Sequence, residues 1–347
     1  MIKVGITQGN INGVSYELIL KTLEEPHIME SCIPVVYGSS KAMAYYRKTL
    51  DIQGLNISTI HRAEDAAAHR INLINLGSEE MVVELGKYTD ESVKASEAAF
   101  NRALDDLKAG VIDALVLSPA VTDPFKPVLL ALNEEKKGLK IWVNDTLRIS
   151  LATNQINLKE VPSLLNVEAL SEKIQNLRTS LIRDFKVTFP RIAVLALNPQ
   201  TGEGKFGKEE DDVIRPAIQV ASDKGVQCFG PYSADQWFAG DDFKKFDAVL
   251  AMYHDQGMIA FQMLTNEEGA FFIANTPYII TSSNTNAQFD KAGKNETSPD
   301  SFRNALFLAI DLYYNRKNDE ECRRNPLKKQ YFERGSDNEK LDLSKED

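Results

Sequence analysis

Cysteine is scarce in this 347-residue chain, which has Cys32, Cys228 and Cys322 far apart in the sequence. An odd number without paired spacing argues against both a disulfide framework and a zinc knuckle, so we expect buried free thiols. Long apolar runs are lacking as well, since none reaches the roughly 18 residues needed to span a membrane. The first residues do not show the charged, apolar and small-residue pattern of a signal peptide, and we expect a cytoplasmic protein.

Positive charge is also in deficit, because 40 Lys and Arg face 50 Asp and Glu, for a formal charge of -10. Nucleic acids and anionic membranes both favour clustered Lys and Arg, so neither is expected as a partner. What the chain does contain is typical of a soluble globular protein, with 43% hydrophobic and 26% charged residues. The length favours two lobes or two domains over a single core.

Short apolar segments alternate with longer amphipathic ones along the chain. The short segments are bounded by turn residues and are typical of buried parallel strands: 4–7, 33–37, 114–117, 140–143, 149–152, 192–196 and 248–252. Residues 92–108 and 213–224 have helical periodicity. This alternation predicts an α/β fold. The polar end, residues 326–347, is expected to be a disordered tail.

Three long strings of residues carry a specific resemblance. They are AVLAMYHDQG at 248–257, PRIAVLALNPQTGEG at 190–204 and FGPYSAD at 229–235, supported by similar strings at 4–17 and 301–316. Their order and spacing resemble the 4-hydroxythreonine-4-phosphate dehydrogenase family of pyridoxal phosphate (vitamin B6) biosynthesis. The resemblance implies a two-lobed fold like that of isocitrate and isopropylmalate dehydrogenases, with a cleft between the lobes. It places residues 1–118 and 287–325 in the first lobe, and residues 119–286 in a second lobe that forms a homodimer.

The family oxidises a secondary alcohol with NAD, and the product then loses carbon dioxide with the help of a divalent metal. Three histidines drawn from both subunits hold that metal. The matching positions here are Gln155, Gln200 and His254. A carboxamide oxygen is a poor ligand for a transition metal. The two glutamines at these positions therefore predict that the metal is absent here. The alternative interpretation of His254 is that it only forms hydrogen bonds within the fold.

The positions that bind the anionic substrate in the family are also changed. Thr122, Gln262 and Ile280 match a lysine, a lysine and an arginine, and Phe271 matches an asparagine. These changes remove most of the charges and donors that a phosphate requires. Asp235 and Asp255 match acidic positions that contact substrate in the family, although an isolated aspartate is as often a turn or helix cap.

A glycine-rich segment is the one remaining sign of a nucleotide. Gly202, Gly204 and Gly207 are kept, which is weak support for NAD binding.

Three functions stay open on the basis of the sequence. The first is a divergent family member whose dehydrogenase activity is lost or strongly reduced and whose cleft binds another, less anionic small ligand. The second is an active 4-hydroxythreonine-4-phosphate dehydrogenase with an unusual site, and the third is a non-catalytic subunit paired with an intact paralogue.

Overall fold

The computed structural model describes residues 1–78, 81–121, 123–134, 137–199, 206–265 and 268–324. Four of the predicted site residues lie outside the described residues: Thr122, Gln200, Gly202 and Gly204. The predicted tail at 326–347 lies outside them too.

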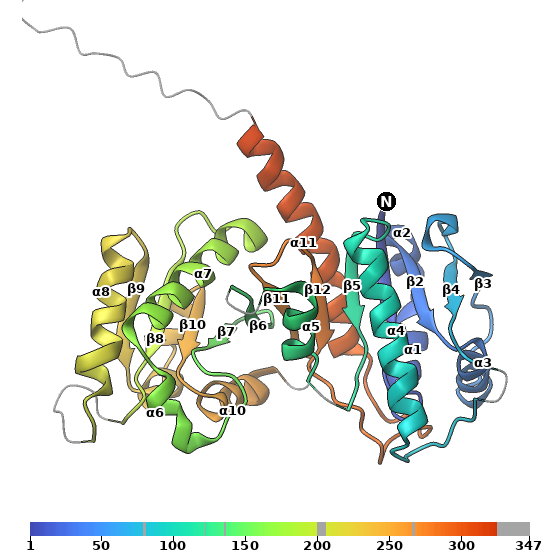
Figure 1. Ribbon diagram of the computed structural model, residues 1–347, viewed down its shortest axis with the longest axis horizontal. Helices are drawn as coiled ribbons and strands as arrows, with labels where there is room; N and C mark the ends of the chain where they lie inside the picture. Colours follow the sequence, from blue (N-terminus) through green and yellow to red (C-terminus); the bar gives the residue numbers. More distant parts are fainter. Residues whose placement is uncertain (79–80, 122, 135–136, 200–205, 266–267, 325–347) are drawn as a thin grey trace, which may run out of the picture.

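A single 12-stranded sheet runs through the described part of the molecule, in the order β3-β4-β2-β1-β5-β12-β11-β6-β7-β10-β8-β9 (Figure 1). The strands are β1 (Ile2–Thr7), β2 (Cys32–Gly38), β3 (Ile57–Ile60), β4 (Ile71–Asn75), β5 (Ala114–Leu117), β6 (Leu139–Val143), β7 (Arg148–Leu151), β8 (Arg191–Leu195), β9 (Gln227–Tyr232), β10 (Ala248–Ala251), β11 (Ala270–Ala274) and β12 (Ile280–Ser283). All seven predicted strands are present within two residues of their expected bounds.

The expectation of parallel strands is wrong for residues 140–143, at the centre of the sheet. β6 runs antiparallel to both of its neighbours, β7 and β11, and β11 runs antiparallel to β12. Only residues 144–147 join β6 to β7, and a parallel pair needs a crossover of about a dozen residues or more. The short connection therefore forces the chain to turn back on itself.

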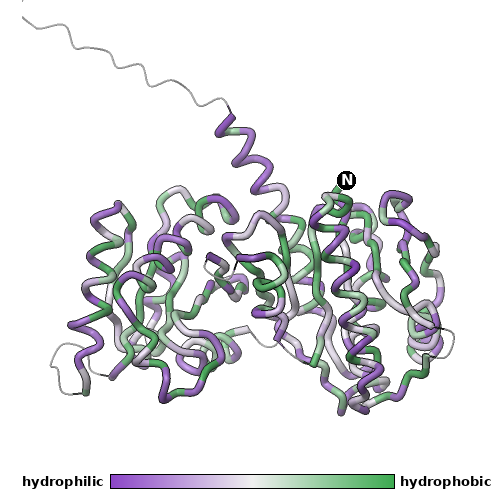
Figure 2. The backbone as a smooth tube through the Cα atoms, in the orientation of Figure 1, coloured by the Kyte–Doolittle hydropathy of each residue, from purple (hydrophilic) through white to green (hydrophobic). Residues whose placement is uncertain are grey.

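Helices cover both faces of the sheet. One face carries α1 (Ser15–Leu23), α2 (Pro26–Ser31), α3 (Ser40–Thr49), α7 (Val167–Phe185), α8 (Arg215–Asp223) and α11 (Asp300–Arg324). The other carries α4 (Asp90–Lys108), α5 (Phe125–Leu132), α9 (Ala234–Ala239) and α10 (His254–Thr265). The strands alternate accordingly, with Ala114 and Val116 facing the first layer and Leu115 and Leu117 the second. Figure 2 shows hydrophobic residues along these strands and a hydrophilic last part of α11.

The predicted helices and the α/β class are confirmed. Residues 92–108 form most of α4, and residues 213–224 form α8 after a π-helical turn at Glu210–Ile214. The short helix α6 (Val161–Leu164) completes the α-helices of the described residues, and single 3-10 turns occur at Ala63–Asp65, Leu158–Glu160 and Asp242–Lys245. The predicted lobe boundaries stay a prediction, because the strands form one sheet and β12 lies directly beside β5.

Two of the three cysteines are buried as expected, and the third is not. Cys32 and Cys228 are buried, whereas Cys322 is exposed. Cys322 lies in the last turns of α11, which extend away from the body of the molecule (Figure 1), so no layer packs against it. Across the residues that the structure describes, no helix combines the length and the apolar character that a membrane crossing requires.

The second helical layer is divided into two hydrophobic clusters. One is built by α4 and α5, and the other by α9 and α10. β6, at the centre of the sheet, contributes Trp142 to the α9 and α10 cluster. The candidate site lies on this face, where α5 and α10 approach β6.

Candidate functional site

Gln155 and His254 are brought together by two neighbouring parallel strands. β7 pairs in parallel with β10, so the carboxyl ends of the two strands meet at the same edge of the sheet. The pairing continues beyond both strands, since the Ala152 amide donates to the Ala251 carbonyl at 2.7 Å and the Thr153 amide to the Met252 carbonyl at 3.1 Å. Gln155 follows the first strand and His254 begins α10 after the second.

The start of α10 is fixed by the glutamine of the His-Asp-Gln-Gly string. Gln256 Oε1 accepts from the Met252 amide at 2.7 Å, and its Nε2 donates to the Ala196 carbonyl after β8 at 2.6 Å. The following glycine allows α10 to lie close to the sheet. A Cβ at Gly257 would be 3.0 Å from Leu151 Cδ2 and 3.1 Å from Ala251 Cβ. Two residues of the string therefore position the histidine.

Two pockets share Gln155, His254 and Asp255. One has a volume of about 440 Å³ and is lined also by the segment 154–158, and the other has a volume of about 530 Å³ and extends to β6. Gln155 and Asp255 are exposed, whereas His254 is half-buried. The Nδ1 atom of His254 is buried and has no hydrogen-bond partner among the described residues. A buried polar atom without a partner is uncommon in proteins, and it marks His254 as a residue whose hydrogen bonding is incomplete.

The donor set at this position does not suit a transition metal. Among the described parts of the chain, no group of three or more His, Cys, Asp and Glu side chains is placed to hold a metal ion. The side chains that share both pockets with His254 are a carboxamide, Gln155, and a carboxylate, Asp255. Metals of this class favour imidazole and thiolate ligands. Gln200 lies outside the described residues, and the absence of metal stays a prediction.

The predicted substrate positions are only partly assembled. Gln262 lines the 530 Å³ pocket, whereas Ile280 is a core residue that is 1% exposed. Phe271 is buried on β11 beside Trp142, with ring centroids 6.2 Å apart. Asp235 is exposed at the start of α9 and lines neither pocket.

The carboxylate of Asp235 is instead engaged locally. Ser233 Oγ donates a hydrogen bond to Asp235 Oδ1. This bond, together with the Gln236 amide, holds the pKa of Asp235 below its ordinary value. Such a contact is typical of a helix start and fits the turn or cap interpretation.

Lys140 is a pocket residue that sequence analysis missed. It lies on β6, is 6% exposed and lines the 530 Å³ pocket. Its Nζ donates to Asp123 at 2.9 and 3.0 Å. Burial lowers the pKa of Lys140, and Asp123 opposes that effect. The signal in the sequence was a single charged residue within an apolar strand, Leu139–Val143.

Two carboxylates lie beside the described part of the glycine-rich segment. Asn198 Nδ2 donates to Glu209 at 2.9 Å, and the Asn198 amide donates to Glu210 at 2.8 Å. Gly207 has a φ of +156°, which favours glycine, and a Cβ there would be 2.1 Å from Glu209 Oε2. Two carboxylates beside the loop disfavour a phosphate at Gly207.

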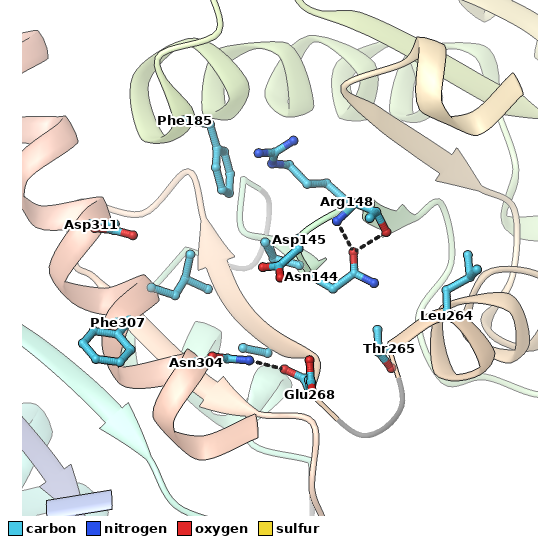
Figure 3. A pocket seen from close by; sticks show the side chains of 14 residues that line it. Asn144, Asp145, Arg148, Phe185, Leu264, Thr265, Glu268, Asn304, Phe307 and Asp311 are labelled. Carbon is cyan, nitrogen blue, oxygen red and sulfur yellow. Dashed lines mark hydrogen bonds between the residues drawn. The ribbon is translucent and has the colours of Figure 1, made fainter. Parts of the chain in front are cut away.

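A further pocket of about 500 Å³ lies between the β6–β7 connection, α10 and α11 (Figure 3). Two of its polar side chains are engaged locally: Asn144 Oδ1 accepts from the Thr146 and Leu147 amides, and Asn304 donates to the Glu268 carbonyl at 2.8 Å. The Arg148 guanidinium stacks over Phe185 at 4.4 Å. None of the predicted site residues lines this pocket.

Comparisons with known proteins agree with the resemblance. The model of the family described as pyridoxal phosphate biosynthetic protein PdxA matches residues 30–309. A 4-hydroxythreonine-4-phosphate dehydrogenase of Bacteroides thetaiotaomicron is 39% identical, covering 99% of this chain and 97% of the relative. One of Sulfurihydrogenibium is 32% identical, covering 91% of this chain and 100% of the relative.

Solved structures agree on the fold. A 4-hydroxythreonine-4-phosphate dehydrogenase of Burkholderia phymatum has a TM-score of 0.73 and 26% identity, covering 90% of this chain and 98% of that one. One of Klebsiella pneumoniae has a TM-score of 0.76 and 24% identity, covering 90% of this chain and 100% of that one. The predicted two-lobed fold like that of isocitrate and isopropylmalate dehydrogenases is thus confirmed. On the match of the family model and the identity over nearly its whole length, the chain belongs to the PdxA family.

Proposed function

We propose that this member of the PdxA family has lost or strongly reduced the NAD-dependent oxidation and decarboxylation, and that its 530 Å³ pocket binds another small ligand. The observation that carries the proposal is the set of side chains around His254. A glutamine and an exposed aspartate share the pockets with this histidine, and the buried Lys140, paired with Asp123, lines the 530 Å³ pocket. Such a set offers hydrogen bonds and one paired cation where metal-assisted oxidation needs several strong metal ligands.

A second candidate is an active 4-hydroxythreonine-4-phosphate dehydrogenase that uses an unusual site. The comparisons favour this candidate over a loss of activity, since a relative of that name is 39% identical over 99% of the chain. The two candidates differ in one measurable property, the turnover of 4-hydroxythreonine-4-phosphate.

The test follows NAD reduction with 4-hydroxythreonine-4-phosphate and a series of added divalent metals, with an intact family member as control. We expect no turnover from the folded protein, because donors for both the metal and the anion are replaced. Turnover within about a hundredfold of the control would establish the second candidate, since that loss corresponds to only about 2.7 kcal/mol. Circular dichroism of the same sample shows that the protein is folded.

The proposal includes a homodimer in which a second copy covers the surface beside the pockets. Large apolar side chains are exposed there: Leu158 is 65% exposed, Ile259 61% and Met263 77%. Leu158 lines the 440 Å³ pocket, and Ile259 and Met263 line the 530 Å³ pocket. Apolar side chains gathered in this way are typical of protein interfaces. Light scattering should give the mass of a dimer, and Met263→Asp should shift it toward the monomer.

A further inference from the structure

Lys140 is a buried cation in the family's cleft at a position that the family resemblance does not assign. Its side chain is 6% exposed, and transferring an ammonium group out of water is costly unless the group is paired. Asp123 is its hydrogen-bond partner among the described residues, through both carboxylate oxygens. An ammonium group has three hydrogens to donate, so one carboxylate leaves donor capacity unused.

Aromatic rings surround the same ammonium group. Its Nζ lies 3.8 Å from the ring centroid of Phe271, 4.7 Å from that of Trp142 and 6.0 Å from that of Phe125. Cation–π attraction to these rings favours the charged form of the lysine. The ion pair with Asp123 and these rings together suit Lys140 to bind an anion.

The two members of the ion pair are held unequally. Asp123 has 30% of its side chain exposed, and its Oδ1 also accepts from the Phe125 amide at 3.0 Å. It lies in the connection between β5 and α5, whereas Lys140 lies within the central strand β6. If Asp123 turns away from the lysine, its carboxylate keeps water and an amide as partners. Lys140 has no such alternative and would need a replacement carboxylate.

The walls of the 530 Å³ pocket indicate what else such a ligand carries. Trp142, Met258 and Met263 supply apolar surface, while Gln155 and Asn284 supply hydrogen-bonding groups. Asp255 lines the same pocket and disfavours a second negative charge on the ligand.

We propose that this pocket binds a small, flat monocarboxylate whose carboxylate group pairs with Lys140 in place of Asp123. Asp123 is then an internal competitor that occupies the lysine until the ligand arrives. This inference rests on the proposed function, because it requires that the pocket binds a small ligand other than the phosphorylated substrate of the family.

Benzoate is a suitable probe, and benzamide is its uncharged counterpart of nearly the same shape. Calorimetric titration of the full-length protein should give saturable binding of benzoate and at least about tenfold weaker binding of benzamide. Trp142 lies against the lysine, so its fluorescence should change with benzoate. Trp237 is the other tryptophan of the chain, and the Trp237→Phe variant isolates the Trp142 signal.

Two substitutions separate a binding role from a purely structural one. Lys140→Met should abolish benzoate binding, while Lys126→Met on the exposed side of α5 should leave it unchanged. Asp123→Asn removes the competitor and should tighten benzoate binding by about tenfold. Benzoate should also raise the melting temperature of Asp123→Asn more than that of the wild type.

A folded Asp123→Asn protein that binds benzoate no better than the wild type would overturn the inference. So would a Lys140→Met protein that still binds it. These outcomes are independent of the dehydrogenase assay, because absent turnover together with absent benzoate binding rejects only the inference. Turnover of 4-hydroxythreonine-4-phosphate rejects the proposed function itself.

Discussion

The family resemblance matches Gln155 to a metal-binding histidine, and it matches Gln200, outside the described residues, to a second one; both matches stay predictions. We expect the wild-type protein to retain no stoichiometric zinc, cobalt, nickel or manganese after dialysis. The double substitution Gln155→His with Gln200→His should raise metal affinity steeply, whereas either single substitution should do little, because ligands act jointly. Elemental analysis of the dialysed wild-type and variant proteins measures the metal bound per chain.

Gln262→His is the matched control, since Gln262 lines the 530 Å³ pocket together with Gln155 but matches no metal ligand of the family. About one tightly held metal per wild-type chain would contradict the prediction. A double variant that gains no metal would show that the correspondence of Gln155 and Gln200 with the family's histidines is wrong.

Gln256 is a residue whose role is structural although it sits in the most specific string of the sequence. Its side chain bonds the Met252 amide and the Ala196 carbonyl. Gln256→Ala leaves both groups without this partner and should lower the free energy of unfolding by about 1–3 kcal/mol. Urea denaturation measures the change. Gln262→Ala, on the exposed side of the same helix, should stay within about 0.5 kcal/mol of the wild type, and an equal loss in both variants would refute the positioning role.

At the scale of elements, α10 depends on a close approach to the sheet. A methyl group at Gly257 would meet Leu151, Ala251 and Ile149 at 3.0 to 3.1 Å. Gly257→Ala should therefore destabilise the protein by about 1–3 kcal/mol, as overpacking of a core does. Thermal unfolding measures the loss.

Gly240→Ala is the control for this prediction, because the nearest atoms to its added methyl would be 4.0 Å away. It should change the free energy of unfolding by less than about 0.5 kcal/mol. If Gly257→Ala proves as mild as Gly240→Ala, the packing of α10 on β7 and β10 is looser than the structure indicates.

The strands of the sheet show which features the local sequence pattern predicts and which it does not. The apolar run at 140–143 was enough to predict β6 but not its direction, which follows from the short connection to β7. β11 (Ala270–Ala274) was missed although it is apolar throughout, because a short buried run does not distinguish a strand from a helix segment. β3 (Ile57–Ile60) was missed for another reason, since it lies at the sheet edge and is only partly buried.

At the scale of the whole molecule, a buried ion pair joins α7 to α11. Arg316 Nε donates to Asp184 Oδ1 at 2.7 Å, and Arg183 and Ser180 also donate to this carboxylate. Asp184→Asn should lower the free energy of unfolding by about 3–5 kcal/mol, because it leaves the buried Arg316 guanidinium without its carboxylate. Arg316→Met should cost less, because Arg183 and Ser180 still donate to Asp184. The double variant should lose less than the sum of the two. Strict additivity in chemical denaturation would contradict a direct coupling.

The same pair gives a pH dependence with a definite sign. Burial alone would raise the pKa of Asp184, but Arg316 and Arg183 outweigh it and hold the pKa below the ordinary value of 3.8. The stability from this carboxylate is thus present above its unfolded pKa and is lost as pH falls through the folded pKa. As the pH falls below about 4, the wild type should lose stability more steeply than Asp184→Asn. Parallel curves would show that Asp184 does not contribute.

Local sequence determined the α/β class, because the alternation of short apolar runs with amphipathic segments depends only on neighbouring residues. The family resemblance pointed to Gln155 and His254, and they lie close together because two parallel strands end at one edge of the sheet. Only the tertiary structure revealed Lys140 and Asp123 as a pair, since they are 17 residues apart in sequence and meet where β6 passes the start of α5. The residues next to Lys140 in the sequence do not reveal which carboxylate it pairs with. That partner is decided by the loop and the aromatic rings that the folded sheet places around the lysine.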